Sequence, residues 1–181
     1  MIKTKIYAYL KSRLLEEAKL YKSLKLMDNH LTFGNVHPLA KSTTYNIRDI
    51  ARIHIRLKIV TGNYILQSDK AAFSKKSTSP TCLLCKKSEE TTTHFLIVCE
   101  KLEETRTPIL SKIIQEVSSV FAELKLCGKI DLLQIIINLF AYVAGDKVTN
   151  LTDSIINSLE PICRQLLYAL HNKRYALLQS T

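Results

Sequence analysis

The chain has 181 residues, of which 46% are hydrophobic and 23% charged, and its formal net charge is +10. This length is typical of about one domain, and the apolar content excludes a chain that is disordered throughout. Residues 1–7 are interrupted by lysines and do not resemble a secretory signal.

The spacing of apolar residues predicts helices almost throughout and no alternating strand. The first predicted helix covers residues 6–26, and we expect five of its residues in a core: Ile6, Tyr9, Leu10, Leu14 and Leu24. Further helices are predicted over residues 45–58, 64–73, 102–126, 132–143, 152–159 and 161–179, the last with Pro161 in its first turn. The apolar stretch 132–144 is shorter than the roughly 20 residues that cross a bilayer, so we expect a buried helix and no membrane partner.

Three arginines recur every four residues on the helix predicted over residues 45–58. On a helix, Arg48, Arg52 and Arg56 form one stripe about 80° wide, which suits bidentate contacts to phosphates. The apolar residues fall on a different face, which we expect to be the packed one: Ile47, Ile50, Ile53 and Leu57. His54 lies among these apolar positions and is predicted at the core or its boundary. A solvated charged face without a ligand would give the same arginine pattern.

The basic excess lies entirely in the first part of the chain. Residues 1–76 carry 15 Lys and Arg against 5 acidic residues, whereas residues 77–181 carry 11 of each. RNA or DNA phosphates are the partners that such an excess favours. The candidate nucleic-acid contacts are Arg48, Arg52, Arg56, Lys58, Lys75, Lys76, Lys86 and Lys87.

Four residues of metal-ligand type lie within 18 residues, in the pattern C-x2-C-x8-H-x4-C formed by Cys82, Cys85, His94 and Cys99. Four Cys and His donors are the typical shell of a structural zinc site, and they leave no coordination position for a substrate. We therefore predict one structural Zn²⁺, with His94 and Cys99 on roughly one face of a short helix. Ordinary buried cysteines and a core histidine are the alternative.

The remaining cysteines, Cys127 and Cys163, each lie in an apolar stretch and are predicted to be buried structural thiols. Five cysteines without a signal peptide indicate a reducing compartment, so we expect an intracellular protein, nuclear or cytoplasmic. Together these features predict a mainly α fold, with small helical domains organised around a zinc-binding turn-helix motif. The predicted divisions are a basic helical region (1–76), the zinc motif (77–105) and a neutral helical region (106–181).

Several short motifs carry a resemblance to a known family. These are Thr61-Gly62-Asn63-Tyr64 before the cysteines, Glu90-Thr91 and His94-Phe95-Leu96 within the motif, Arg106 after it, and the closing Leu170-His171-Asn172-Lys173-Arg174. Together with the Cys-Cys-His-Cys spacing they resemble the C-terminal zinc-binding region of non-LTR retrotransposon reverse transcriptases. The resemblance implies a zinc ion on the four ligands and a role in gripping RNA or target DNA during target-primed reverse transcription. It also implies a reverse transcriptase polypeptide as a partner.

The chain lacks the paired-aspartate motif of a polymerase, so we expect a detached tail of such a protein and no enzyme. Four carboxylates are scattered among the predicted helices, without a strand to hold them, and do not indicate a nuclease: Asp131, Asp146, Asp153 and Glu160. We expect no small-molecule substrate. Glu89 and Glu90 would repel phosphate at the zinc motif, so the basic helices should do most of the binding. The alternative function is a protein-interaction or scaffolding remnant that docks through the apolar helices at 132–143 and 161–178.

Overall fold

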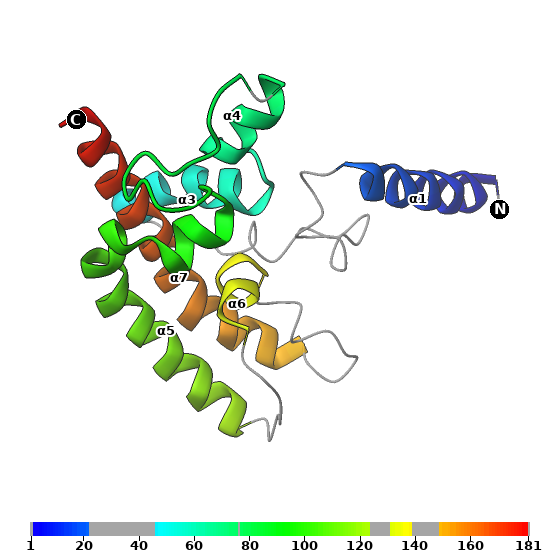
Figure 1. Ribbon diagram of the computed structural model, residues 1–181. Helices are drawn as coiled ribbons and strands as arrows, with labels where there is room; N and C mark the ends of the chain where they lie inside the picture. Colours follow the sequence, from blue (N-terminus) through cyan, green and yellow to red (C-terminus); the bar gives the residue numbers. More distant parts are fainter. Residues whose placement is uncertain (1, 22–45, 76, 124–130, 139–148, 181) are drawn as a thin grey trace.

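The computed structural model describes residues 2–21, 46–75, 77–123, 131–138 and 149–180, and this part of the chain is mainly helical, as predicted (Figure 1). None of its residues belongs to a β-strand, although Thr81 and Glu89 form an isolated antiparallel bridge. The α-helices are α1 (Ile2–Leu20), α3 (Ile47–Val60), α4 (Gln67–Phe73), α5 (Glu103–Glu123), α6 (Leu132–Asn138) and α7 (Thr149–Gln179). A π-helical turn, η2 (His94–Val98), and a 3-10 turn, η3 (Glu100–Leu102), precede α5.

The long helix α7 is the centre of the fold, because it packs against both α3 and α5 (Figure 1). Its buried face includes Leu159, Cys163, Leu166, Leu167 and Leu170. The prediction of two helices separated before Pro161 is wrong, since one helix continues through this proline. Proline removes one intrahelical hydrogen bond, and the packing of α7 on both neighbours compensates for that loss.

Helix α3 turns a different face to the core than its apolar residues predict. Asn46 caps the helix by accepting the N–H of Arg48 at 2.9 Å, and Ile55, Ile59 and Val60 are buried. The residues predicted to be packed are exposed or only half-buried, with Ile47 82% exposed. His54, predicted at the core or its boundary, is exposed as well.

The reason is a set of ion pairs that fixes the rotation of α3. Arg56, only 1% exposed, donates from Nε and Nη2 to the two carboxylate oxygens of Glu160 on α7, each at 3.0 Å, and Nη1 donates to the carbonyl of Ile136. Asp49 accepts from Arg164 Nη1 at 2.7 Å. Asp49 and Arg56 therefore face α7, and the expectation that Arg56 presents its guanidinium to a phosphate is wrong.

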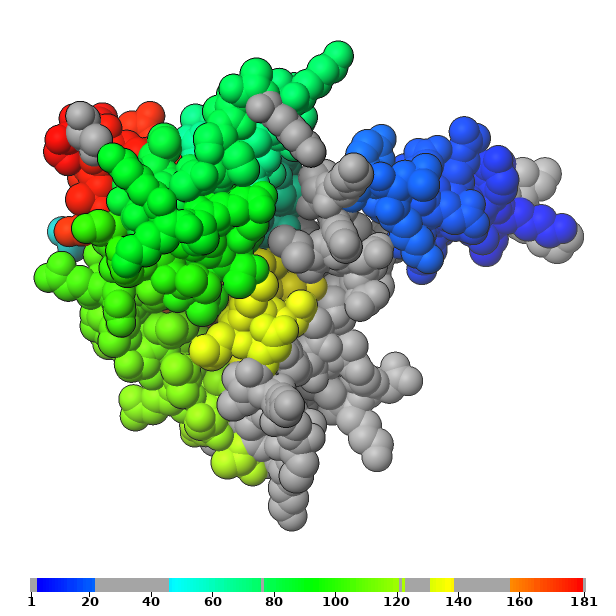
Figure 2. All heavy atoms as spheres, in the orientation of Figure 1, coloured from blue at the N-terminus to red at the C-terminus, as the bar shows by residue number. Residues whose placement is uncertain are grey.

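Helix α1 contributes nothing buried to the fold. None of its described side chains is buried, and the predicted core positions Ile6, Tyr9, Leu10 and Leu14 are all exposed; Leu24 lies outside the described residues. The helix projects from the remaining elements in the space-filling view (Figure 2). The prediction of these residues as core is wrong, because their apolar character is not accompanied by a packing surface.

The three regions distinguished by charge and motif contribute to one hydrophobic cluster. Ile59 from α3, Phe95 and Leu96 from η2, Ile113 from α5 and Leu166 from α7 all belong to it. Stacking between the rings of Tyr64 and Phe95, with centroids 5.3 Å apart, ties the end of α3 to η2. None of the helices in the described part combines the length and apolar character that a bilayer-spanning helix needs.

Candidate metal centre

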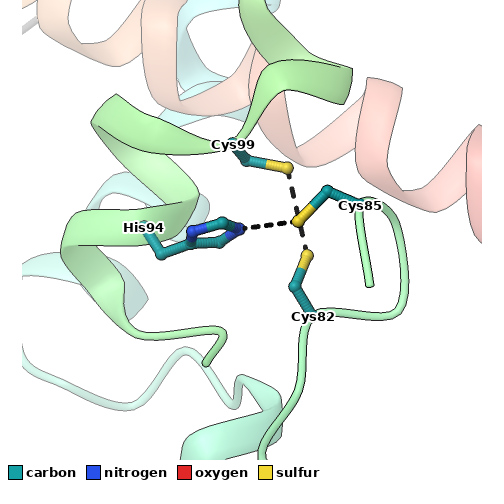
Figure 3. Close-up of side chains that lie close together, drawn as sticks. All are labelled: Cys82, Cys85, His94 and Cys99. Carbon is teal, nitrogen blue, oxygen red and sulfur yellow. Dashed lines mark hydrogen bonds between the residues drawn. The ribbon is translucent and has the colours of Figure 1, made fainter. Parts of the chain in front are cut away.

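A tight turn positions the first two cysteines. The Cys82 N–H donates to the Ser88 carbonyl at 2.8 Å, and the Lys86 N–H donates to the Cys82 carbonyl at 2.9 Å. Lys86 takes a left-handed backbone conformation with φ of 57°, which reverses the chain after Cys85. These bonds direct both sulfur atoms to the same side of the turn (Figure 3).

The other two ligands come from a π-helical turn and not from the short α-helix that the spacing suggested. Positions five apart on an ideal α-helix point about 140° away from each other, so such a helix would separate His94 from Cys99. In the structure the Cys99 N–H donates to the His94 carbonyl at 2.8 Å, a bond that spans five residues. This wider turn brings the imidazole and the thiol to the same site.

The four donor atoms form a closed cluster, all within 4.8 Å of one another. Cys82 Sγ lies 3.9 Å from Cys99 Sγ, and Cys85 Sγ lies 3.4 Å from His94 Nε2 (Figure 3). A tetrahedral zinc ion bonded to sulfur at about 2.3 Å and to nitrogen at about 2.0 Å places two sulfurs about 3.8 Å apart, and sulfur and nitrogen about 3.5 Å apart. The Cys82–Cys99 and Cys85–His94 separations match this geometry, and the cysteines are not joined by a disulfide.

The orientation of His94 also suits a metal ligand. Its Nδ1 lies 2.9 Å from the Ser88 hydroxyl, while Nε2 faces the cysteines. A proton on Nδ1, donated to the Ser88 oxygen, leaves the Nε2 lone pair directed at the cluster. Ser88 thus fixes the imidazole in the position that a metal needs.

The protonation of the cluster determines what a metal must displace. Burial raises the pKa of Cys99 to about 12 and also raises the pKa of Cys82. Burial opposes ionisation of Cys85 too, but N–H groups of Lys87 and Ser88 donate to its sulfur, and its pKa is lowered overall. Burial lowers the pKa of His94, so the imidazole is neutral at pH 7. A metal ion therefore binds by displacing thiol protons.

Two arginines hold the site in place through contacts that sequence patterns do not reveal. Arg174 on α7 donates from Nε and Nη2 to the Glu90 carboxylate at 2.9 and 3.0 Å, and that carboxylate also accepts the Gln67 N–H at 2.9 Å. Glu90 is 1% exposed, so the expectation that it repels phosphate is wrong. Arg106 donates to the Cys99 carbonyl at 3.1 Å. In the sequence, Arg106 and Arg174 were marked only by the resemblance, whereas Glu90 was also singled out by its charge.

The predicted nucleic-acid contacts fall into different environments. The side chains of Arg48, Lys58, Lys75 and Lys86 are exposed. Lys87 is exposed but pairs with Glu100 at 2.7 Å, and Arg52 is partly buried beside Asp49, with 3.9 Å between the charged atoms. Arg56 is buried, and Lys76 lies outside the described residues. The structure therefore does not present the predicted arginine stripe as one surface.

The remaining cysteines and carboxylates named from the sequence are buried or hydrogen-bonded within the fold, where the structure describes them. Cys163 is buried, as predicted, and burial raises its pKa to about 12. Glu160 is paired with Arg56, and Asp131 accepts the Gln134 N–H at 3.1 Å at the start of α6. The position of Cys127 and Asp146 and the side chain of Asp153 lie outside the described part of the chain.

Comparisons of the chain with protein-family models, with curated proteins and with solved structures found no significant match. Function is therefore inferred from the residues of this chain. What they define directly is a mainly α protein with a Cys and His cluster of metal-site geometry.

Proposed function

We propose that this protein is a nucleic-acid-binding module stabilised by one structural Zn²⁺, related to the C-terminal zinc-binding region of non-LTR retrotransposon reverse transcriptases. The single observation that carries the proposal is the cluster of Cys82, Cys85, His94 and Cys99, whose donor atoms lie within 4.8 Å of one another. Three cysteines and one histidine suit zinc better than magnesium or calcium, which prefer oxygen ligands. All four protein donors are used, so the role of the ion is to hold the fold.

The charge of the chain supports nucleic acid as the ligand. The net charge is +10, and basic side chains on α3, after α4 and on the zinc turn are exposed: Arg48, Lys58, Lys75 and Lys86. Cations of this kind bind phosphates and displace counterions, which makes the affinity depend on salt. The burial of Arg56 removes one predicted contact but leaves this set available.

The described residues give less support to the alternative of docking through the C-terminal helices. The apolar residues of α6 and of the described part of α7 are largely used inside the protein, including Ile135, Ile136, Leu166 and Leu170. A docking surface would need such residues exposed. Nucleic-acid binding is therefore the function that we propose.

A salt titration with a matched pair of lysine variants tests the proposal. Binding of a labelled RNA or DNA oligonucleotide should weaken more than tenfold between 50 and 200 mM salt, since each phosphate contact adds to the salt dependence. Lys58→Ala on α3 should reduce the slope of log K against log salt by about 0.7 to 0.9. Lys112→Ala, an exposed lysine on α5, is the control and should leave the slope unchanged. Affinity that is absent, or independent of salt, would contradict the proposal.

A further inference from the structure

A pocket of about 370 Å³ opens beside the metal site, on the side where α4 and the end of α7 meet the Cys82–Cys85 turn. Its walls come from Gln67 and Lys70 on α4, Leu83 on the turn, and Arg174, Tyr175 and Gln179 on α7. Pockets that hold small organic groups are typically about 300 to 1,000 Å³. The volume is therefore sufficient for one planar ring system.

The lining of this pocket favours an anionic, aromatic ligand. Lys70 is exposed, and none of the seven lining residues is acidic. Arg174 also lines the pocket, but its guanidinium is paired with the Glu90 carboxylate, so Lys70 is the cation left for a ligand. The amides of Gln67 and Gln179 supply both donors and acceptors. A larger pocket of about 580 Å³ near Phe73 contains Asp69 and no Lys or Arg, so it is less suited to a phosphate.

An exposed tyrosine forms one wall and contacts a neighbouring ring. Tyr175 is 55% exposed, and its ring centroid lies 5.6 Å from that of His171, one helical turn earlier. His171 is itself fixed, because its Nδ1 lies 2.9 Å from the Tyr64 hydroxyl. A ring supported in this way loses little conformational freedom when a second ring stacks on it.

We propose that this pocket binds one unstacked base and a neighbouring phosphate of a single-stranded nucleic acid. The base stacks on Tyr175, and Lys70 contacts the phosphate. Stacking on aromatic side chains beside cations is the general mode by which proteins hold single strands. This inference rests on the proposed function and deepens it, since it names a site and the single-stranded class. The metal site would also help to shape this pocket, because the turn that carries Cys82 contributes Leu83 to the pocket wall.

The test measures binding of labelled 12-nucleotide single strands of RNA and of DNA, and of the same DNA as a duplex, by fluorescence anisotropy. The full chain should bind the single strands at least fivefold more tightly than the duplex, in which bases are already stacked. Tyr175→Ala should raise the single-strand Kd about tenfold, and Tyr175→Phe, which keeps the ring, less than twofold. The control is Tyr9→Ala, at a tyrosine on α1 that is 62% exposed, and it should change Kd less than twofold.

The phosphate contact has its own readout. Lys70→Gln should reduce the salt slope for single strands by about 0.7, a change that a merely structural lysine would not produce, and Lys112→Gln should not reduce it. Comparison of the RNA and DNA arms identifies which strand the pocket prefers.

The outcomes separate the two proposals. If the wild-type chain binds no nucleic acid, both the proposed function and this pocket assignment are overturned. If it binds but Tyr175→Ala and Lys70→Gln behave like their controls, the pocket assignment is wrong while the proposed function stands. A preference for the duplex would likewise overturn the single-strand assignment.

Discussion

The burial of Arg56 shows that the arginine stripe of α3, formed by Arg48, Arg52 and Arg56, is not a single phosphate-binding surface. Both charged contacts of Arg56 go to Glu160, and both residues are 1% exposed. Replacement by methionine would remove this partner and leave the Glu160 carboxylate buried. Removing one partner of a buried ion pair typically lowers the free energy of unfolding by about 3 to 5 kcal/mol. We expect Arg56→Met to lower the free energy of unfolding by about that amount in urea denaturation followed by circular dichroism.

The matched control is Arg48→Met, because Arg48 lies on the same helix with an exposed side chain. Its effect should stay within about 0.5 kcal/mol, as is usual for surface substitutions. Equal stability of the two variants would contradict the ion-pair assignment. If an Arg56 variant binds nucleic acid more weakly, we therefore expect the cause to be its lower stability and not the loss of a phosphate contact.

The thiol pKa values predict how metal affinity depends on pH. The pKa of Cys99 is about 12 and that of Cys82 is raised, both through burial, so these thiols are protonated at pH 7 without a metal. Binding releases these protons, and each released proton makes the affinity rise about tenfold per pH unit. Zinc affinity measured with a competing chelator should thus increase at least tenfold per unit from pH 6 to pH 8. A flat profile over this range would mean that the thiols are not the ligands.

The four ligands were predictable from the sequence because their chemistry is local. Cys82 and Cys85 share one turn, and His94 and Cys99 follow within 14 residues of Cys85. The burial and pairing of Arg56 and Glu90 were not predictable, since their partners lie 104 and 84 residues away along the chain. Charge alone cannot distinguish an arginine that faces water from one that faces a distant carboxylate.

At the scale of elements, local patterns predicted the existence of helices better than their faces and ends. Helices α3 and α5 lie where apolar spacing placed them, but the buried face of α3 follows Asp49 and Arg56 as well as its isoleucines. Pro161 suggested a helix start and is instead inside α7, because tertiary packing outweighs one lost hydrogen bond. The π turn at η2 brings His94 and Cys99 together, and helix propensity does not predict such a turn.

Helix α1 should be dispensable for the stability of the rest of the fold. No described side chain of α1 is buried, so deletion of residues 1–21 should remove no core contact. We expect the shortened chain to keep its metal content, and its unfolding free energy to change by less than about 1 kcal/mol. Urea denaturation together with metal analysis checks this. A loss of several kcal/mol would show that α1 packs on the fold.

For the whole molecule, the metal site and the core depend on each other. Phe95, Leu96 and Leu102 come from the segment that carries the ligands, yet they belong to the same cluster as residues of α3, α5 and α7. Structural zinc contributes about 10 to 16 kcal/mol of apparent binding free energy in small domains. If the proposed zinc ion occupies the site, its removal should therefore disturb the shared core and not only residues 77–105.

The most direct test of this account is the zinc content of the purified full chain, measured by elemental analysis and native mass spectrometry, with Cys85→Ser alongside. We predict one zinc ion per wild-type chain and, for Cys85→Ser, loss of the ion together with loss of the cooperative thermal transition. A cooperatively folded wild-type chain that contains no zinc, or a Cys85→Ser variant that keeps both its zinc and its transition, would contradict the assignment of the metal centre.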